Sequence, residues 1–497
     1  MSRSSSRGLW LLAPVAAALL VAGCASTDGV APSNAQLRDA ASLGLSASQA
    51  AAEVAPIEPQ WWQALGDPQL DRLVEQALQG SPNLRVAQAR VARALAAADG
   101  VDAASGPQLN GQFDATHQRF TAKGMVPAPL AGSIQDTATL QLNGSWEIDF
   151  FGRHRAALDA ALGSAQAAQA EAAAARTLLA TNVVRGYVQL ARLQDQRELA
   201  ERALAQRQGM LDLVNQRVSA GLDGVLEQRQ SEGAVPEARQ QIEAINEQIE
   251  LTRHALAALI GQPTQDPAPQ PPRLAGLRPL PEPRALPTDL LGRRADIAAA
   301  RWRVEASRGE VANARAQFYP NLNLVAYVGL SSIGLDELLT SGAKQWGIGP
   351  AVRLPIFDGG RLRANLSGRN ADLDAAIESY NAAVVEAVHE VADQLASARS
   401  VALQRAQQQQ ALQSAESAYA IAEQRYRAGL SNHLQLLSAE TAVLAQRRLD
   451  VDLRTRALQA QVNLAQALGG GWREPTDASP TPATHAAVPM RSAAERP

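Results

Sequence analysis

The sequence contains few of the residues on which disulfides, nucleic-acid binding and enzyme catalysis depend. One cysteine occurs among its 497 residues, so no disulfide can form within the chain. The net charge is −3, and no basic stripe is interleaved with aromatic residues, which excludes the usual signature of a nucleic-acid-binding protein. Neither a glycine-rich phosphate loop nor an HExxH zinc motif is present. We therefore predict no catalytic site, no cofactor other than a covalent lipid, and no nucleic-acid partner.

Aromatic residues are also scarce, at 4%, although 46% of the residues are hydrophobic. Alanine dominates the apolar residues, which suits long helices packed side by side better than a thick globular core. The histidines are isolated, and no pair has the spacing of metal ligands with a third group nearby, so we predict no metal site. They are His117, His154, His254, His389, His433 and His485.

The N-terminus has the pattern of a bacterial secretory signal. Two arginines precede an apolar stretch over residues 9–20, and small residues then lead to Cys24. This arrangement resembles a lipobox, in which the signal is cut before the cysteine and the cysteine receives lipid. An ordinary signal peptide with a chance cysteine is the alternative. Ala25 follows the cysteine, and by the same resemblance this implies export to the outer membrane, since an aspartate there commonly retains lipoproteins on the inner one.

The second half of the chain repeats landmarks of the first half in the same order. Pro-x-Leu-Asn at 107–110 returns at 320–323, and Ala-Gly-Leu at 220–222 returns at 428–430. Such self-similarity predicts a duplicated architecture. Chance similarity between alanine-rich helices is the alternative, but the shared order argues against it.

Each half is predicted to contain a helix, a β-hairpin and a long helical hairpin. The longest segments with helical periodicity lack proline, and each would extend roughly 100 Å at about 1.5 Å per residue. Gly221 and Gly429 tolerate the left-handed conformation and mark the tips of the hairpins. A generic coiled-coil rod is the alternative, but the apolar positions keep no strict heptad. The predicted helices span residues 68–103, 154–218 and 225–260 in the first half and 290–317, 361–427 and 433–468 in the second.

Between the first and second helix of each half, polar and apolar residues alternate with the period of a two-faced strand. Beyond the signal, no segment approaches the roughly 18 apolar residues of a membrane helix, so a membrane-crossing chain must cross as strands. Four strands are too few for a barrel, since single-chain barrels use about eight or more, whereas three copies supply twelve. The edge of a soluble sandwich is the alternative. The apolar positions are Leu109, Phe113 and Ala115, then Leu140, Leu142, Trp146, Ile148 and Phe150, then Leu322, Leu324, Ala326 and Val328, and finally Trp346, Ile348, Val352, Leu354 and Ile356.

These elements divide the chain into six segments. Proline and glycine cluster between the two repeats, and proline, alanine and threonine dominate the C-terminus, where we predict disorder. The segments are a signal peptide (1–23), a lipidated extended segment (24–66), a first repeat (67–261), a proline-rich linker (262–289), a second repeat (290–468) and a disordered tail (469–497).

Several motifs resemble the TolC and OprM family of outer-membrane efflux proteins, and specifically its NodT-type lipoproteins. The resemblance covers nearly the whole mature chain. Ala295 departs from it, because the family usually has proline there, and this puts one helix start in doubt. The motifs are Trp-Trp at 61–62 followed by Gly-Asp-Pro at 66–68, Ser-Pro-Asn-Leu at 81–84, Phe-Tyr-Pro at 318–320, Pro-Ile-Phe-Asp-Gly-Gly-Arg at 355–361 and Tyr-x-x-Gly at 426–429.

The resemblance implies a mostly α fold with a small transmembrane β part. A homotrimer would join a twelve-stranded barrel in the outer membrane to a twelve-helix periplasmic tube. The implied function is a passive exit channel of a tripartite efflux system for small molecules such as drugs or toxic compounds, without enzyme activity. The implied partners are outer-membrane lipid, a periplasmic adaptor and an inner-membrane pump, which we expect to be of the resistance-nodulation-division type. The rival interpretation is a lipid-anchored periplasmic adaptor or coiled-coil spacer, but no lipoyl-like β domain is found.

The resemblance also implies a closed resting state, held by polar and ionic contacts near the tips. As a hypothesis, Arg217 or Arg425 bridges to a neighbouring helix, and loss of the bridge opens the pore. The alternatives are that the charges only solvate helix ends and that the tip glycines serve only the turn. The gating candidates are Arg217, Asp223, Glu227, Arg425, Tyr426 and Gln435, and the adaptor-contact candidates are Gly221, Leu222, Gly429 and Leu430.

Overall fold

The computed structural model describes residues 27–38, 57–262, 266–280 and 290–474. The predicted signal peptide, Cys24 and residues 475–497 of the predicted tail lie outside these ranges. Within the described residues, no helix combines the length and the apolar character that crossing a membrane requires.

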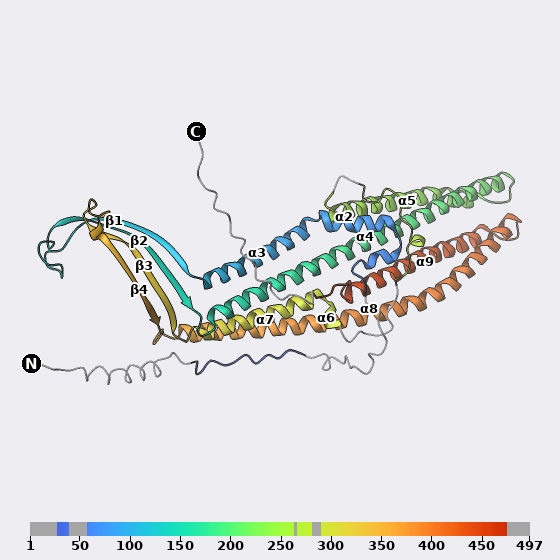
Figure 1. The fold of residues 1–497 in the computed structure, drawn as a ribbon. Helices are drawn as coiled ribbons and strands as arrows, with labels where there is room; N and C mark the ends of the chain where they lie inside the picture. Colours follow the sequence, from blue (N-terminus) through green and yellow to red (C-terminus); the bar gives the residue numbers. More distant parts are fainter. Residues whose placement is uncertain (1–26, 39–56, 263–265, 281–289, 475–497) are drawn as a thin grey trace, which may run out of the picture.

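Long helices make up most of the described chain, and they run from the sheet to two distant tips (Figure 1). α4 and α8 have 67 residues each, which corresponds to about 100 Å. α3 and α5 lie one after the other along α4, and α7 and α9 lie in the same way along α8. The helices are α2 (Pro68–Gly80), α3 (Pro82–Ser105), α4 (Arg153–Ser219), α5 (Val225–Leu259), α6 (Leu290–Arg293), α7 (Ala295–Ala316), α8 (Arg361–Arg427) and α9 (His433–Ala467).

The first predicted helix of each half is wrong as a single helix, because the structure divides both. In the first half the break falls at Ser81, whose backbone is extended (ψ 122°), as expected for a residue before proline. In the second half it falls at Arg294, which is also extended (ψ 125°). α7 nevertheless begins at Ala295, the position equivalent to Pro82 in the first repeat. The missing proline therefore leaves the helix start unchanged.

Four antiparallel strands form one sheet in the order β1-β2-β3-β4. One face exposes large apolar side chains, among them Phe113, Trp146 and Ile348. The other face is polar on β1 and β2, as the alternation predicts, but carries Val325 and Tyr327 on β3. β1 and β4 are edge strands, so each has a row of backbone groups with no strand partner among the described residues. The strands are β1 (Gln108–Arg119), β2 (Ile134–Ile148), β3 (Asn321–Ile333) and β4 (Lys344–Arg353).

Two strands end earlier than their alternation predicts, at Ile148 rather than Phe150 and at Arg353 rather than Ile356. Shortly after each strand, an aspartate forms hydrogen bonds with the first turn of the next helix. Asp149 accepts a hydrogen bond from the backbone N–H of Arg155, at 2.9 Å, near the beginning of α4. Asp358 accepts one from Leu362, also at 2.9 Å, near the beginning of α8. These bonds satisfy backbone N–H groups in the first turn of each helix.

The main hydrophobic core lies midway along the helices, where the 3-10 helix η3 (Trp61–Leu65) and α2 pack on α4. Trp61, Trp62 and Tyr187 are buried there. The Tyr187 hydroxyl donates to Asp67 Oδ2 at 2.6 Å, and Asp67 also caps α2 through the N–H of Gln69. The Trp-Trp and Gly-Asp-Pro motifs therefore serve this core.

The prediction of disorder from residue 469 onward is wrong at its start, because residues 469–474 are ordered. The Glu474 carboxylate accepts hydrogen bonds from Arg301 at 2.7 Å and from the Trp302 indole at 2.9 Å. Both partners lie on α7, so the second repeat continues beyond α9.

Candidate functional site at the helical tips

The two helical hairpins end in turns of the same geometry. Gly221 and Gly429 both have φ = 72°, the left-handed conformation that favours glycine. In the first turn, the N–H of Leu222 donates to the carbonyl of Arg217 at 2.8 Å, and in the second Leu430 donates to Arg425 at the same distance. The structure thus places the predicted tips at the predicted residues.

A polar network joins the two hairpins just above these turns. Arg217 holds both carboxylate oxygens of Asp223, with distances of 2.8 Å from Nε and 3.2 Å from Nη2. Tyr426, at the end of α8, donates its hydroxyl proton to Asp223 at 2.5 Å. Arg217 also donates to the Tyr426 carbonyl at 3.3 Å and lies over its ring, 4.6 Å from the centroid. Three of the predicted gating residues therefore form one cluster that spans both repeats.

The tip network combines a charged Arg217–Asp223 pair with a neutral Tyr426 hydroxyl. Hydrogen bonds from Arg217 hold the pKa of the Asp223 carboxyl below its usual value. Burial and the nearby carboxylate raise the pKa of the Tyr426 phenol, so it remains a neutral donor. The side chains of Arg217 and Asp223 are 13% and 10% exposed, so the pair is largely shielded from water. Such an ion pair is stronger than one on an open surface.

A buried histidine completes the contact between the hairpins. His433, the first residue of α9, packs 5.7 Å from the Tyr426 ring, and its Nε2 lies 3.3 Å from the hydroxyl of Ser231 on α5. Burial lowers the pKa of the imidazole, and the nearby Asp223, Glu227 and Glu440 oppose this effect. Sequence reasoning considered this histidine only as a metal ligand and rejected it, because no pair of histidines has ligand spacing with a third group nearby.

The remaining gating candidates are not part of this cluster. Glu227 accepts a hydrogen bond from the N–H of Gly224 at 3.0 Å, so it caps the beginning of α5. Arg425 and Gln435 are exposed in the single chain, at the second tip. Within one chain, the structure therefore brings Arg217 to a partner on the other hairpin, whereas Arg425 is exposed.

A second polar bridge between the hairpins lies further from the tips. Arg207 on α4 lies 3.2 Å from Glu440 on α9 and 3.3 Å from Glu237 on α5. Glu440 is buried, and Arg207 donates a hydrogen bond to its carboxylate. Sequence reasoning missed the bridge, because 233 residues separate Arg207 from Glu440 and no local motif marks either one.

Several large apolar side chains are exposed at the tips. Leu222 and Leu430, both adaptor-contact candidates, are 66% and 69% exposed. Val225, Leu226 and Leu434 are also exposed nearby. Exposed apolar side chains gathered at one end of a molecule are typical of a protein-binding surface.

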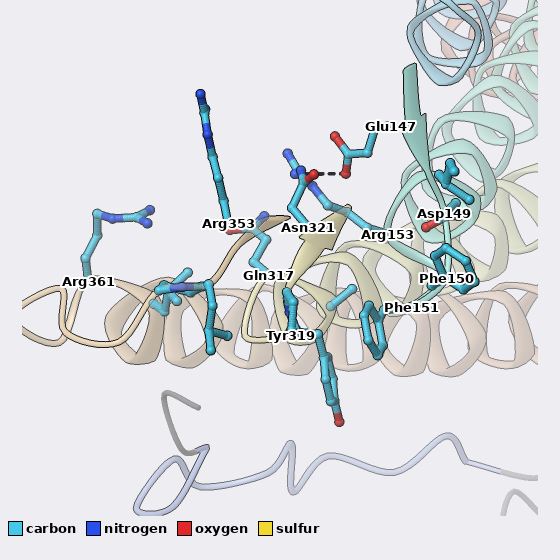
Figure 2. Close-up of a pocket in the computed structure, with 16 residues that line it drawn as sticks. Glu147, Asp149, Phe150, Phe151, Arg153, Gln317, Tyr319, Asn321, Arg353 and Arg361 are labelled. Atoms are coloured by element: carbon cyan, nitrogen blue, oxygen red, sulfur yellow. Dashed lines mark hydrogen bonds and ion pairs between the residues drawn. The ribbon is translucent and has the colours of Figure 1, made fainter. Parts of the chain in front are cut away.

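At the opposite end, a pocket of about 510 Å³ lies where the sheet meets the helices (Figure 2). Glu147 at the end of β2 pairs with Arg153 at the beginning of α4, 3.3 Å apart, and Arg353 points away from Phe151 and Tyr319. The rings of Phe151 and Tyr319 are stacked 4.9 Å apart. Within the described part of the chain, no group of three or more His, Cys, Asp or Glu residues could hold a metal ion. The pocket therefore offers charged and aromatic surface rather than a metal site.

The sequence matches the model of the outer membrane efflux protein family over residues 73–262 and 286–470. It is 37% identical over 376 residues to the fusaric acid resistance protein FusA of Burkholderia cepacia, covering 75% of this chain and 71% of that one. It is 34% identical over 431 residues to the multidrug resistance outer membrane protein MdtP of Escherichia coli K12, covering 84% and 87%.

Solved structures have the same fold. The outer membrane protein VceC of Vibrio cholerae superposes with a TM-score of 0.78 at 37% sequence identity, and the match covers 84% of this chain and 99% of VceC. The outer-membrane channel OprN gives a TM-score of 0.78 at 28% identity, with coverage of 90% and 99%. The predicted mostly α, TolC-like fold is thereby confirmed.

Proposed function

The chain belongs to the outer membrane efflux protein family, and we propose that it is an exit channel opened and closed by contacts at its helical tips. An outer-membrane efflux channel is what the family, the relatives and the structural neighbours have in common. The family and fold are those of transport channels rather than enzymes. The rival interpretation as an adaptor is not supported, because none of these similarities is to an adaptor.

The shape of the chain supports a duct assembled from several copies. Its sheet has an apolar face, a more polar face and two edge strands, and its two longest helices each extend about 100 Å. Channels of this family work as homotrimers together with adaptors and inner-membrane pumps. We propose the same for this chain, with a pump of the resistance-nodulation-division type, and with drugs or other toxic compounds as cargo.

The observation that carries the gate proposal is the cluster of Arg217, Asp223 and Tyr426. Two of these side chains belong to the first hairpin and the third to the second. If the hairpins separate to widen the tip, the hydrogen bond from the Tyr426 hydroxyl to Asp223 breaks. The hydrogen bond from Arg217 to the Tyr426 carbonyl breaks as well. The closed state is therefore stabilised by bonds that the open state lacks.

The exposed leucines support an adaptor-binding role for the same end. Leu222 and Leu430 lie beside the turn glycines, on the part of the chain furthest from the sheet. An adaptor that buries them gains apolar contact area, and it can at the same time separate the hairpins. Binding and opening would then be coupled.

Lipid attachment at Cys24 is part of the proposal. The lipobox-like sequence supports it, and the outer membrane is the location named for the relatives. The lipid would hold the N-terminus at the membrane surface from which the helices extend.

Single-channel conductance in a planar bilayer, combined with the mass of the protein in detergent, tests the proposal. Discrete conductance steps from a trimer are expected. A monomer without conductance would overturn the channel assignment for this chain. Conductance from trimers that carry no lipid would leave the channel standing and remove the anchor.

A further inference from the structure

Residues 27–38 lie along α8, whose side chains form hydrogen bonds with five backbone groups of the segment (Figure 1). Asn370 donates to the carbonyl of Ala31 at 2.7 Å. Asp374 accepts from the N–H groups of Asn34 and Ala35, at 3.1 and 3.0 Å, and from the Ser33 hydroxyl at 2.6 Å. The segment is therefore bound through backbone groups and the Ser33 hydroxyl, and Val30 and Ala35 add apolar contacts.

A third side chain on α8, Asn381, both donates a hydrogen bond to the segment and accepts one from it. The amide of Asn381 donates to the Gln36 carbonyl at 3.0 Å and accepts from the Arg38 N–H at 2.9 Å. This donor and acceptor pair imitates a neighbouring strand. Asn370 and Asn381 are only 5% and 4% exposed, so the bonds are shielded from water.

The spacing of the three side chains on α8 makes them a continuous track. Positions 370, 374 and 381 are separated by four and seven residues, which places them on one face of a helix. Between them, Val30 and Ala35 of the segment pack against the apolar cluster that contains Leu366, Leu373 and Ile377. Bonds from the Ser33 hydroxyl and the Ala35 backbone lower the pKa of Asp374, which keeps it an acceptor.

The segment runs along α8 with its N-terminal end, which leads to Cys24, nearer the sheet. Ala31 lies beside Asn370 and Arg38 beside Asn381, so the earlier residues lie nearer the beginning of α8, where the sheet is. Asn370 follows the first residue of α8 by nine positions, about 14 Å along the helix. Cys24 precedes Ala31 by seven residues, which can reach about 24 Å. The reach thus exceeds the distance to the beginning of α8 by only about 10 Å.

We propose that Asn370, Asp374 and Asn381 form a backbone-binding track that sets how far the N-terminal lipid reaches from the channel to the membrane. This inference rests on the proposed lipid at Cys24. Because the track fixes the segment in one register, the number of residues between Cys24 and the track sets the depth at which the channel sits in the membrane. Asn370, Asp374 and Asn381 are positioning residues, since they do not touch the lipid.

The test combines a shortened segment with a broken track. Deletion of residues 27–29 leaves three residues between Cys24 and Ala31, so four residue steps give a reach of about 14 Å and the anchor only just spans the distance. The amount of trimer recovered from the outer membrane is expected to fall severalfold. Adding Asn370→Ala, Asp374→Ala and Asn381→Ala to this deletion is expected to restore it, because the freed segment can shift toward the membrane.

A purely structural role for the track predicts the opposite, namely that the combined variant is worse than either alone, and that result would overturn the inference. Full recovery of trimer from the deletion variant alone would overturn it as well. A matched control is Arg369→Ala with Asp372→Ala, on the same stretch of α8: Arg369 lies 3.4 Å from Asp372 and 3.8 Å from Glu310 on α7. This control is expected not to rescue the deletion.

Mass spectrometry of the N-terminus and single-channel recording of the wild-type trimer separate this inference from the proposed function. A conducting trimer with an unmodified Cys24 would remove the inference and leave the channel intact. A lipidated protein that never conducts would remove the gate and the channel, while the rescue experiment would still decide the role of the track.

Discussion

The hydroxyl of Tyr426 provides the sharpest test of the tip gate. Tyr426→Phe removes the bond to Asp223 and keeps the buried ring, so it creates no cavity and leaves the Arg217 ion pair in place. A hydrogen bond to a charged group contributes about 1.5 to 3 kcal/mol. At the lower value, the ratio of closed to open state for one chain falls about tenfold.

Trimer symmetry would multiply this effect. If three tips open together, the loss sums to about 4.5 kcal/mol, and the closed state falls by roughly a thousandfold or more. The fraction of time that a single channel conducts in a planar bilayer measures this directly. We expect Tyr426→Phe channels to be open for most of a recording and wild-type channels to be mostly closed.

Arg425→Ala and Gln435→Ala are the matched controls, because both side chains are exposed at the same tip and neither belongs to the cluster. They are expected to behave as wild type. If Tyr426→Phe and Arg425→Ala have the same open fraction, the cluster does not hold the tip closed and the reasoning is refuted.

Three further predictions concern the same end of the molecule. Burial lowers the pKa of His433 from its usual 6.5, so the neutral imidazole stabilises the closed tip fully above pH 6.5, and this stabilisation is lost as the pH falls. The open probability should therefore rise between pH 7.5 and 5. His433→Gln should flatten that rise. Gly429→Ala forces a side chain into the left-handed region, at about 1 to 2 kcal/mol, and should increase protease cleavage at the tip, whereas Gly209→Ala, at a helical glycine with open space around it, should not. Replacing Leu222 and Leu430 by serine should weaken adaptor binding in a pull-down with the purified adaptor while leaving single-channel conductance unchanged; normal adaptor affinity would contradict the docking assignment.

Local sequence patterns predicted most of the fold, because each depends on neighbours along the chain. α4 was predicted over 154–218 and spans Arg153–Ser219, and α8 was predicted over the same residues that it occupies, 361–427. Their ends are fixed by glycine turns that are visible in the sequence. The break at Ser81 was also visible, since a proline follows it, but the helical pattern on both sides obscured it.

The composition of the gate could be predicted only in part. The turn position and the residue types are local, so Arg217, Asp223 and Tyr426 could be named. Which of two equivalent arginines faces the other hairpin depends on how each helix is rotated about its axis, and a periodicity spread around the whole helix does not fix that rotation. His433 was overlooked for the same reason, because its neighbours Ser231 and Tyr426 become close only after folding.

The duplicated architecture explains why the gate joins the repeats. Each repeat supplies the same backbone turn, but the side chains at equivalent positions have diverged, so neither repeat contains the whole cluster. The first provides the arginine and the carboxylate, and the second provides the tyrosine and its carbonyl. Because every bond of the tyrosine to this pair crosses from one hairpin to the other, the closed tip is sensitive to their separation and insensitive to a rotation of both together. The equivalent pairs are Arg217 and Arg425, Asp223 and Ser431, and Val218 and Tyr426.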